Sequence, residues 1–273
     1  GPLEMAGEGF ARRGVMSFDE LADNAEAEIE TRHIRFGDAA AVLWTSGTTG
    51  KPKGVIQSHN VWIRAALNND RLYGTRPGDV AYNCLPLYNS AAWVANIYRA
   101  LSTGIPCALD EQFSVSKFWG RIRHYGATQT MTLGAMHMFL WNEPRRTDDA
   151  DNPLRVASMV PMPQKLIAPF CERFGLEAIV QGLGQSEVMP ILSKVETPAR
   201  QCKPNALGKL FDDMEVKLLR DDGEEAGPGE VGEFSIRPLA PHVIFSGYFD
   251  DPEATSRAYR GEWYCTGDLG MKD

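Results

Sequence analysis

Short apolar segments alternate with helix-like segments through most of the chain, and this alternation limits the possible folds more than any other feature. Apolar runs at residues 39–44, 80–84 and 156–160 are typical of buried strands. Residues 58–69, 91–101 and 164–174 have the spacing of helices. Strands that alternate with helices of this length predict βαβ units. We therefore predict a mixed α/β fold, with largely parallel sheets and flanking helices.

The pattern changes after about residue 205. Apolar segments at 214–219 and 232–237 flank Asp221, Asp222 and Gly223, a combination that favours a tight turn. This pattern predicts a β-hairpin. The α/β portion is therefore expected to be followed by a smaller β-rich portion.

Composition excludes several classes of protein. The chain has 28 basic and 36 acidic residues, a net charge of −8, which opposes binding to nucleic acid. The five cysteines form no CxxC pair, so we expect reduced thiols and a cytoplasmic location. No apolar run reaches the length of a transmembrane helix.

Residues 45–54 carry the strongest chemical signal. Four hydroxyl residues, three glycines and two lysines fall within ten positions after a predicted strand. Backbone N–H groups, hydroxyls and ammonium groups together suit a polyphosphate. Pro52 follows Lys51, so this segment is not a Walker A loop. A solvated turn is the alternative, and the many specified positions oppose it.

The segment 45–54 resembles the phosphate-binding signature of the ANL superfamily of adenylate-forming enzymes. Residues 182–187 are similar to its Tyr-Gly-x-Thr-Glu motif, and residues 263–268 are similar to its Trp-Tyr-x-Thr-Gly-Asp motif. Gly247 and Tyr248 match the segment between these two motifs. The resemblance extends from about residue 38 and favours the acyl-CoA synthetase (AMP-binding) branch.

The resemblance implies that a carboxylate attacks the α-phosphate of ATP and that a thiol then attacks the acyl-adenylate. ATP, Mg²⁺ and coenzyme A are the implied cofactors. Ser186 is expected at the α-phosphate, Glu187 at Mg²⁺ and Asp268 at the ribose hydroxyls; Lys51, Ser186 and Glu187 are the implied catalytic residues. The residues expected around the phosphates are Thr45, Ser46, Gly47, Thr48, Thr49, Gly50, Lys51 and Lys53. Those expected on the nucleotide's other side are Val160, Gly182, Leu183, Gly184 and Gln185.

Departures from the family pattern bear on the substrate. Leu183 replaces an aromatic residue that covers adenine, and Asn89 replaces a histidine at the entrance for the acyl group. Val160 lies where the family has smaller residues. Residues 88–93 include no acid, which disfavours an amino-acid substrate because a buried ammonium needs a counter-charge. The residues expected to contact the acid are Asn89, Trp93, Gly134 and Met136.

These patterns predict three parts: an N-terminal remnant or linker at 1–37, an α/β nucleotide-binding core at 38–205, and a β-rich subdomain at 206–273. The resemblance implies that the family's hinge and lysine-bearing C-terminal domain come after Asp273, and that part of the N-terminal subdomain is absent. This chain alone is therefore expected to bind nucleotide and to form acyl-CoA slowly.

The leading hypothesis is the large-domain portion of an ATP-dependent acyl-CoA synthetase. A module that binds nucleotide or acyl-adenylate without adenylating is one alternative, and an enzyme that loads an acyl carrier protein is another. The expected partners are a carboxylic acid and either coenzyme A or an acyl carrier protein. A homodimer is a further expectation.

Overall fold

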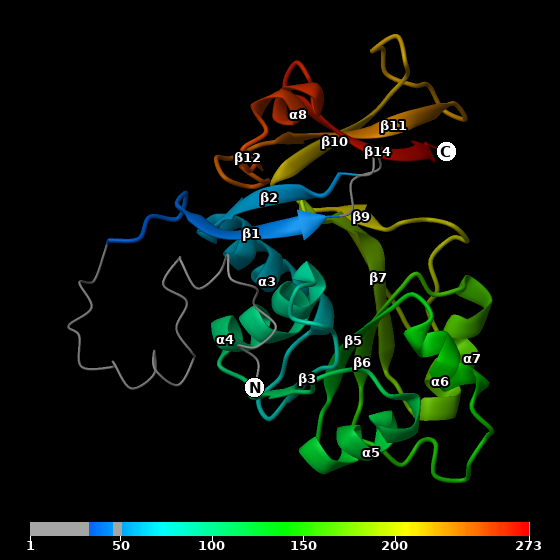
Figure 1. Cartoon of the computed structure of the whole chain (residues 1–273). Helices are drawn as coiled ribbons and strands as arrows, with labels where there is room; N and C mark the ends of the chain where they lie inside the picture. Colours follow the sequence, from blue (N-terminus) through cyan, green and yellow to red (C-terminus); the bar gives the residue numbers. More distant parts are fainter. Residues whose placement is uncertain (1–32, 46–50, 273) are drawn as a thin grey trace, which may run out of the picture. The chain divides into compact units, whose positions relative to one another are not determined.

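The computed structural model describes residues 33–45 and 51–272 (Figure 1). The chain divides into two compact units, Gly1–Ile34 and Arg35–Asp273. All of the helices and strands described below belong to the second unit.

The largest sheet has seven strands in the order β4-β3-β5-β6-β7-β8-β9. The pairs from β4 to β7 are parallel, whereas β7 with β8 and β8 with β9 are antiparallel. The strands are β3 (Ala81–Asn83), β4 (Cys107–Leu109), β5 (Gln129–Leu133), β6 (Val156–Val160), β7 (Ala178–Gln185), β8 (Met189–Glu196) and β9 (Lys209–Leu210).

Helices cover this sheet on both sides, with α6 and α7 on one side and α3 and α4 on the other (Figure 1). Phe118, Leu140 and Phe170, from three of the helices, pack with Ile179 of β7 in the main core. The helices are α3 (His59–Tyr73), the π-helix η2 (Ala92–Ile97), α4 (Tyr98–Thr103), α5 (Val115–Tyr125), α6 (Met136–Asn142), α7 (Gln164–Phe174) and α8 (Pro252–Arg257).

Two antiparallel sheets complete the unit. A three-stranded sheet has the order β1-β2-β12, and a four-stranded sheet has the order β10-β11-β14-β13. Val55 of β2, Ile236 of β11 and Ile191 of β8 belong to one core that joins these sheets to the large sheet. The strands are β1 (Ala39–Thr45), β2 (Lys53–Ser58), β10 (Met214–Leu219), β11 (Val231–Pro238), β12 (Gly247–Tyr248), β13 (Tyr259–Arg260) and β14 (Trp263–Met271).

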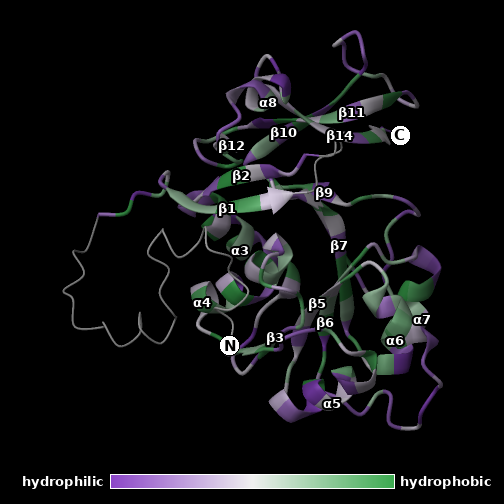
Figure 2. Ribbon diagram, in the orientation of Figure 1, coloured by the Kyte–Doolittle hydropathy of each residue, from purple (hydrophilic) through white to green (hydrophobic). Residues whose placement is uncertain are grey.

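The predicted fold class is confirmed, and so is the hairpin formed by β10 and β11. The loops beside these two strands are hydrophilic (Figure 2). The helix predicted at 91–101 consists of a π-helix followed by an α-helix. The expectation that 39–44 is buried is wrong: β1 is an edge strand, and the Trp44 side chain is 64% exposed.

The division of the chain at residue 205 stays a prediction. Strands from the two sides of that point pair with each other, since β9 joins β8 and β12 joins β2. Most of residues 1–37 lie outside the described residues. No helix in the described part of the chain is long and apolar enough to cross a membrane.

Candidate functional site

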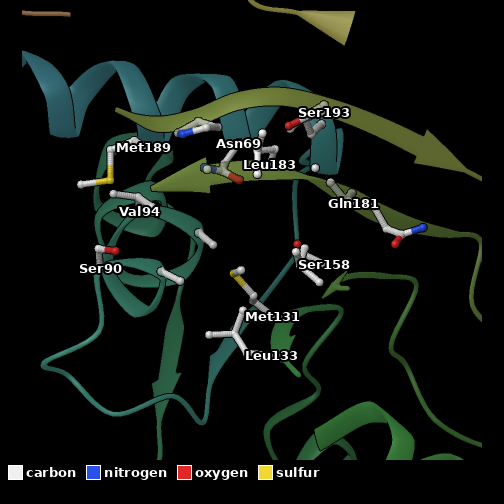
Figure 3. Close-up of a pocket in the computed structure, with 18 of the residues that line it drawn as sticks. Asn69, Ser90, Val94, Met131, Leu133, Ser158, Gln181, Leu183, Met189 and Ser193 are labelled. Carbon is white, nitrogen blue, oxygen red and sulfur yellow. The ribbon is translucent and has the colours of Figure 1, made fainter. Parts of the chain in front are cut away.

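A cavity of about 370 Å³ lies where the parallel strands β5, β6 and β7 end (Figure 3). Ligands of open α/β sheets typically bind at the carboxyl ends of such strands. The π-helix η2, helix α3 and the β7–β8 hairpin supply the other walls. The lining residues are Asn69, Leu72, Asn89, Ser90, Ala91, Val94, Ala95, Met131, Leu133, Ser158, Val160, Val180, Gln181, Gly182, Leu183, Gly184, Gln185, Ser186, Met189, Pro190 and Ser193.

The β7–β8 hairpin brings the segment 182–187 to this cavity. Gly182 pairs with Ser193 across the hairpin, and the two strands approach closely there. A Cβ atom on Gly182 would lie 2.2 Å from the backbone oxygen of Leu192. Only glycine therefore fits at this position without a shift of the backbone.

We expect Gly182→Ala to destabilise the fold by about 2 kcal/mol or more, because the β7–β8 pair must separate to admit the methyl group. The control is Gly120→Ala, an exposed position within α5 where an added Cβ meets no atom within 4 Å. That change should stabilise the helix by about 1 kcal/mol. Equal unfolding free energies for Gly182→Ala and the unchanged chain, measured in urea, would contradict the close approach.

Gln185 holds the carboxylate of Asp268 in place. The Gln185 amide nitrogen donates to Asp268 Oδ2 at 2.7 Å and to the Thr266 carbonyl oxygen at 2.8 Å. Its amide oxygen accepts from the Tyr264 hydroxyl at 3.2 Å. Both ends of the Gln185 amide are therefore occupied, so the side chain fixes the position of Asp268 relative to the cavity.

Glu187 follows the hairpin strand and is 9% exposed. Its Oε1 accepts a hydrogen bond from the Tyr248 hydroxyl at 2.9 Å, and its backbone oxygen accepts from the Phe245 N–H at 2.7 Å. Burial raises the pKa of Tyr248, and the nearby Glu187 carboxylate raises it further. Tyr248 therefore remains a protonated donor to Glu187 at neutral and alkaline pH.

Tyr248 also connects Glu187 to the strand that follows the predicted phosphate loop. Its backbone pairs with Val55 of β2, and the Lys53 ammonium lies 4.7 Å from the centre of its ring. Tyr248 and Tyr264 pack in the same core, and burial together with the nearby Glu187 carboxylate raises the pKa of each. Tyr264 in turn donates to Gln185, which holds Asp268.

Ser186 stands between Gln185 and Glu187 in the chain and lines the cavity. The Gln57 amide of β2 donates to the Ser186 backbone oxygen and lies 3.8 Å from the Met189 sulfur. Gln57 is fully buried, so this contact fixes the backbone beside the Ser186 hydroxyl.

A sequence model described as AMP-binding enzyme matches residues 7–249. The chain belongs to the AMP-binding enzyme family. A crotonobetaine/carnitine–CoA ligase of Escherichia coli is 28% identical over 95% of this chain and 50% of the relative. A medium/long-chain-fatty-acid–CoA ligase of Mycobacterium tuberculosis, FadD17, is 32% identical over 93% of this chain and 49% of the relative.

Solved structures of the family agree with the fold. The O-succinylbenzoate coenzyme A synthetase of Bacillus subtilis in complex with AMP has a TM-score of 0.80 at 27% identity, over 94% of this chain and 52% of that protein. Its complex with ATP and magnesium ion has a TM-score of 0.79 at 28% identity, over 93% and 52%. This chain spans about half the length of the curated relatives it matches.

The structure describes only some of the residues that were expected around the phosphates. Ser46, Gly47, Thr48, Thr49 and Gly50 lie outside the described residues. Thr45 ends β1 opposite Lys53 of β2, and Lys51 is exposed beside them. The strand pair β1–β2 therefore holds both ends of the loop.

Some of the remaining expected residues line the cavity and others do not. Asn89 lines the cavity together with Val160 and the segment 182–186. Trp93, Gly134 and Met136 lie outside its lining: the Trp93 indole donates to the Leu87 backbone oxygen, and Gly134 and Met136 lead into α6. The structure therefore brings only one of the four expected acid-binding residues to the cavity.

Three contact residues were not predicted: Gln57, Tyr248 as the partner of Glu187, and Tyr264. Tyr248 and Tyr264 lie within family-like segments, but their contacts join residues that are far apart in the chain. Gln57 gave no sequence signal beyond its place in a short apolar strand. A pattern of neighbouring residues does not contain such long-range contacts.

The residues present fit a magnesium ion bound mainly by phosphate. Among the described residues, no group of three His, Cys, Asp or Glu side chains could hold a metal ion. Glu187 supplies one carboxylate, with Oε1 bonded to Tyr248. One protein carboxylate with several phosphate oxygens and waters is the usual environment of Mg²⁺.

Proposed function

We propose that this chain forms the nucleotide-binding part of an ATP-dependent acid–thiol ligase. The observation that carries the proposal is that Ser186 and Gln185 line the cavity, while Gln185 bonds to Asp268 and Tyr248 bonds to Glu187, the residue next to Ser186. The reaction joins a carboxylic acid to a thiol. A carboxylate oxygen attacks the α-phosphorus and pyrophosphate leaves; the thiol then attacks the acyl carbon and AMP leaves.

Each side chain of the site has its own role in this reaction. The Asp268 carboxylate accepts hydrogen bonds from the ribose hydroxyls, and the Ser186 hydroxyl donates to the α-phosphate. Lys51 and Lys53 are close enough to the loop to balance phosphate charge. Glu187 is the residue that would hold Mg²⁺, and the ion would supply positive charge to the phosphate oxygens. Fixing the ribose and the α-phosphate in one orientation favours in-line attack.

Coenzyme A is the proposed thiol, and the similarity to CoA ligases supports it. An acyl carrier protein is the alternative acceptor. A homodimer and a cytoplasmic location belong to the same proposal. Supplying each thiol to the protein with its bound acyl-adenylate and measuring thioester formation separates the two acceptors.

A binding module without adenylation activity is the second candidate. The observation that favours it is Leu183, which lies where the family has an aromatic ring, in a cavity whose described lining includes no aromatic residue. A leucine packs against adenine with less contact area than a tyrosine. Weaker adenine binding would suit a protein that receives an acyl-adenylate.

Exchange of labelled pyrophosphate into ATP, screened over carboxylic acids, tests the proposal. Acid-dependent exchange supports the ligase, and calorimetry with ATP and Mg²⁺ reports nucleotide binding independently. Binding without exchange for any acid, in a protein that spans the full length of the relatives, favours the binding module. Absence of binding to both ATP and a non-reactive mimic of the acyl-adenylate removes both candidates.

A further inference from the structure

The wall of the cavity away from Ser186 has a chemical character that the proposed function does not specify. Val94 and Ala95 of η2, Met131 and Leu133 of β5, and Leu72 of α3 contribute apolar side chains to it. Figure 3 shows Val94, Met131 and Leu133 around the same space, below the β7–β8 hairpin. None of the described lining residues carries a charge.

The amides near this wall already have partners. The Asn69 amide nitrogen donates to the Ala65 backbone oxygen of its own helix at 2.8 Å. The Gln181 amide oxygen accepts from the Met162 N–H at 2.9 Å, and its nitrogen donates to Glu196 at 2.7 Å. Gln181 is thus engaged with groups beyond the cavity rather than available to a charged ligand.

The buried acid that contacts Gln181 has charged and polar partners of its own. Glu196 is fully buried and lies 3.1 Å from the Lys194 ammonium. Gln164 and Gln181 also donate to its carboxylate. Glu196 is therefore satisfied, and it does not line the cavity. A cationic ligand would find no counter-charge among the described lining residues.

We infer that the acid taken by this site carries an uncharged, apolar tail. This inference rests on the proposed function, and it assigns the apolar wall away from Ser186 to the acyl group. A tail with a quaternary ammonium, a second carboxylate or an α-ammonium would be buried against apolar side chains without a partner, which is strongly unfavourable. An apolar tail gains binding from each methylene that leaves water.

The sharpest test compares two non-reactive mimics of the acyl-adenylate, both acylsulfamoyl adenosines. One carries the 5,5-dimethylhexanoyl group and the other the 4-(trimethylammonio)butanoyl group. The two tails have nearly the same shape and differ in the charge of one atom. We expect the neutral mimic to bind at least about 100-fold more tightly, measured by calorimetry on the whole chain.

The outcomes separate this inference from the proposed function. Equal affinities, or tighter binding of the cationic mimic, overturn the inference and leave the nucleotide site intact. If neither the mimics nor ATP binds, the proposed function fails and the inference fails with it. Tighter binding of the neutral mimic supports both.

A pair of variants locates the tail. Ser90 is half-buried and lines the cavity near Val94, so a charge there is tolerated more easily than in the deeper wall (Figure 3). Ser90→Asp should reduce the preference for the neutral mimic by about tenfold or more, and the matched Ser90→Asn should leave it unchanged. An unchanged preference in Ser90→Asp would contradict placement of the tail in this cavity.

Discussion

Glu187→Gln should raise the Mg²⁺ concentration needed for half-maximal ATP binding by about 10²–10³-fold. The substitution keeps the size of the side chain and removes the charge that attracts the metal. Glu187 is 9% exposed, so bulk water screens that charge only weakly. Calorimetric titrations of ATP at a series of Mg²⁺ concentrations measure the effect. Superimposable titrations for the variant and the unchanged chain would assign Glu187 a structural role alone.

Tyr248→Phe should have a smaller effect in the same direction, on the order of 10–100-fold. The variant keeps the ring beside Lys53 and removes the hydroxyl that donates to Glu187 at 2.9 Å. Tyr259→Phe is the matched control, because Tyr259 packs in the same aromatic cluster, where its ring is stacked on Phe245. A response of the control as large as that of Tyr248→Phe would indicate a general loss of packing.

The sequence predicted the elements whose signals are local. Strand β6 and helix α7 have the predicted bounds, and Ser58 caps α3 by accepting from the Val61 N–H at 3.3 Å. Capping and hydrophobic periodicity act within a few residues, so a single sequence contains them. Strand β7, in contrast, extends to Gln185 because β8 pairs with it, a contact that the local pattern does not contain.

The candidate site could likewise be predicted only in part. The motif residues Ser186, Glu187 and Asp268 could be named from sequence by resemblance. In the structure Ser186 lines the cavity, and Asp268 is bonded to Gln185, which also lines it. The supporting contacts could not be named from sequence, because the Tyr264–Gln185 and Tyr248–Glu187 bonds span 79 and 61 residues. Trp93, which was expected at the acid, lies outside the cavity lining, and its indole contacts the ring of Trp62 on α3, a contact between residues 31 apart in the chain.

Asp268→Ala should weaken ATP binding by about 10²–10³-fold, because two charge-assisted hydrogen bonds to the ribose are lost. Gln185 orients the carboxylate through Oδ2, at 2.7 Å. Gln185→Leu should therefore weaken binding less, by about tenfold, since the carboxylate remains and only its orientation is lost. Asp222→Ala, an exposed acid near the β10–β11 hairpin, is the control and should leave binding unchanged.

Deoxynucleotides test whether the ribose hydroxyls are the groups that contact the Asp268 carboxylate. The unchanged chain should bind ATP more tightly than 2′-deoxy-ATP or 3′-deoxy-ATP, because each deoxynucleotide leaves one hydrogen bond to the carboxylate unmade. In Asp268→Ala, where the acceptor is gone, the three nucleotides should bind with nearly equal affinity. The coupling between the two changes isolates the ribose contact from any general damage to the site. If Asp268→Ala still discriminates against the deoxynucleotides as strongly as the unchanged chain, another residue holds the ribose. The Gln185–Asp268 contact would then serve only to pack β14 against the β7–β8 hairpin.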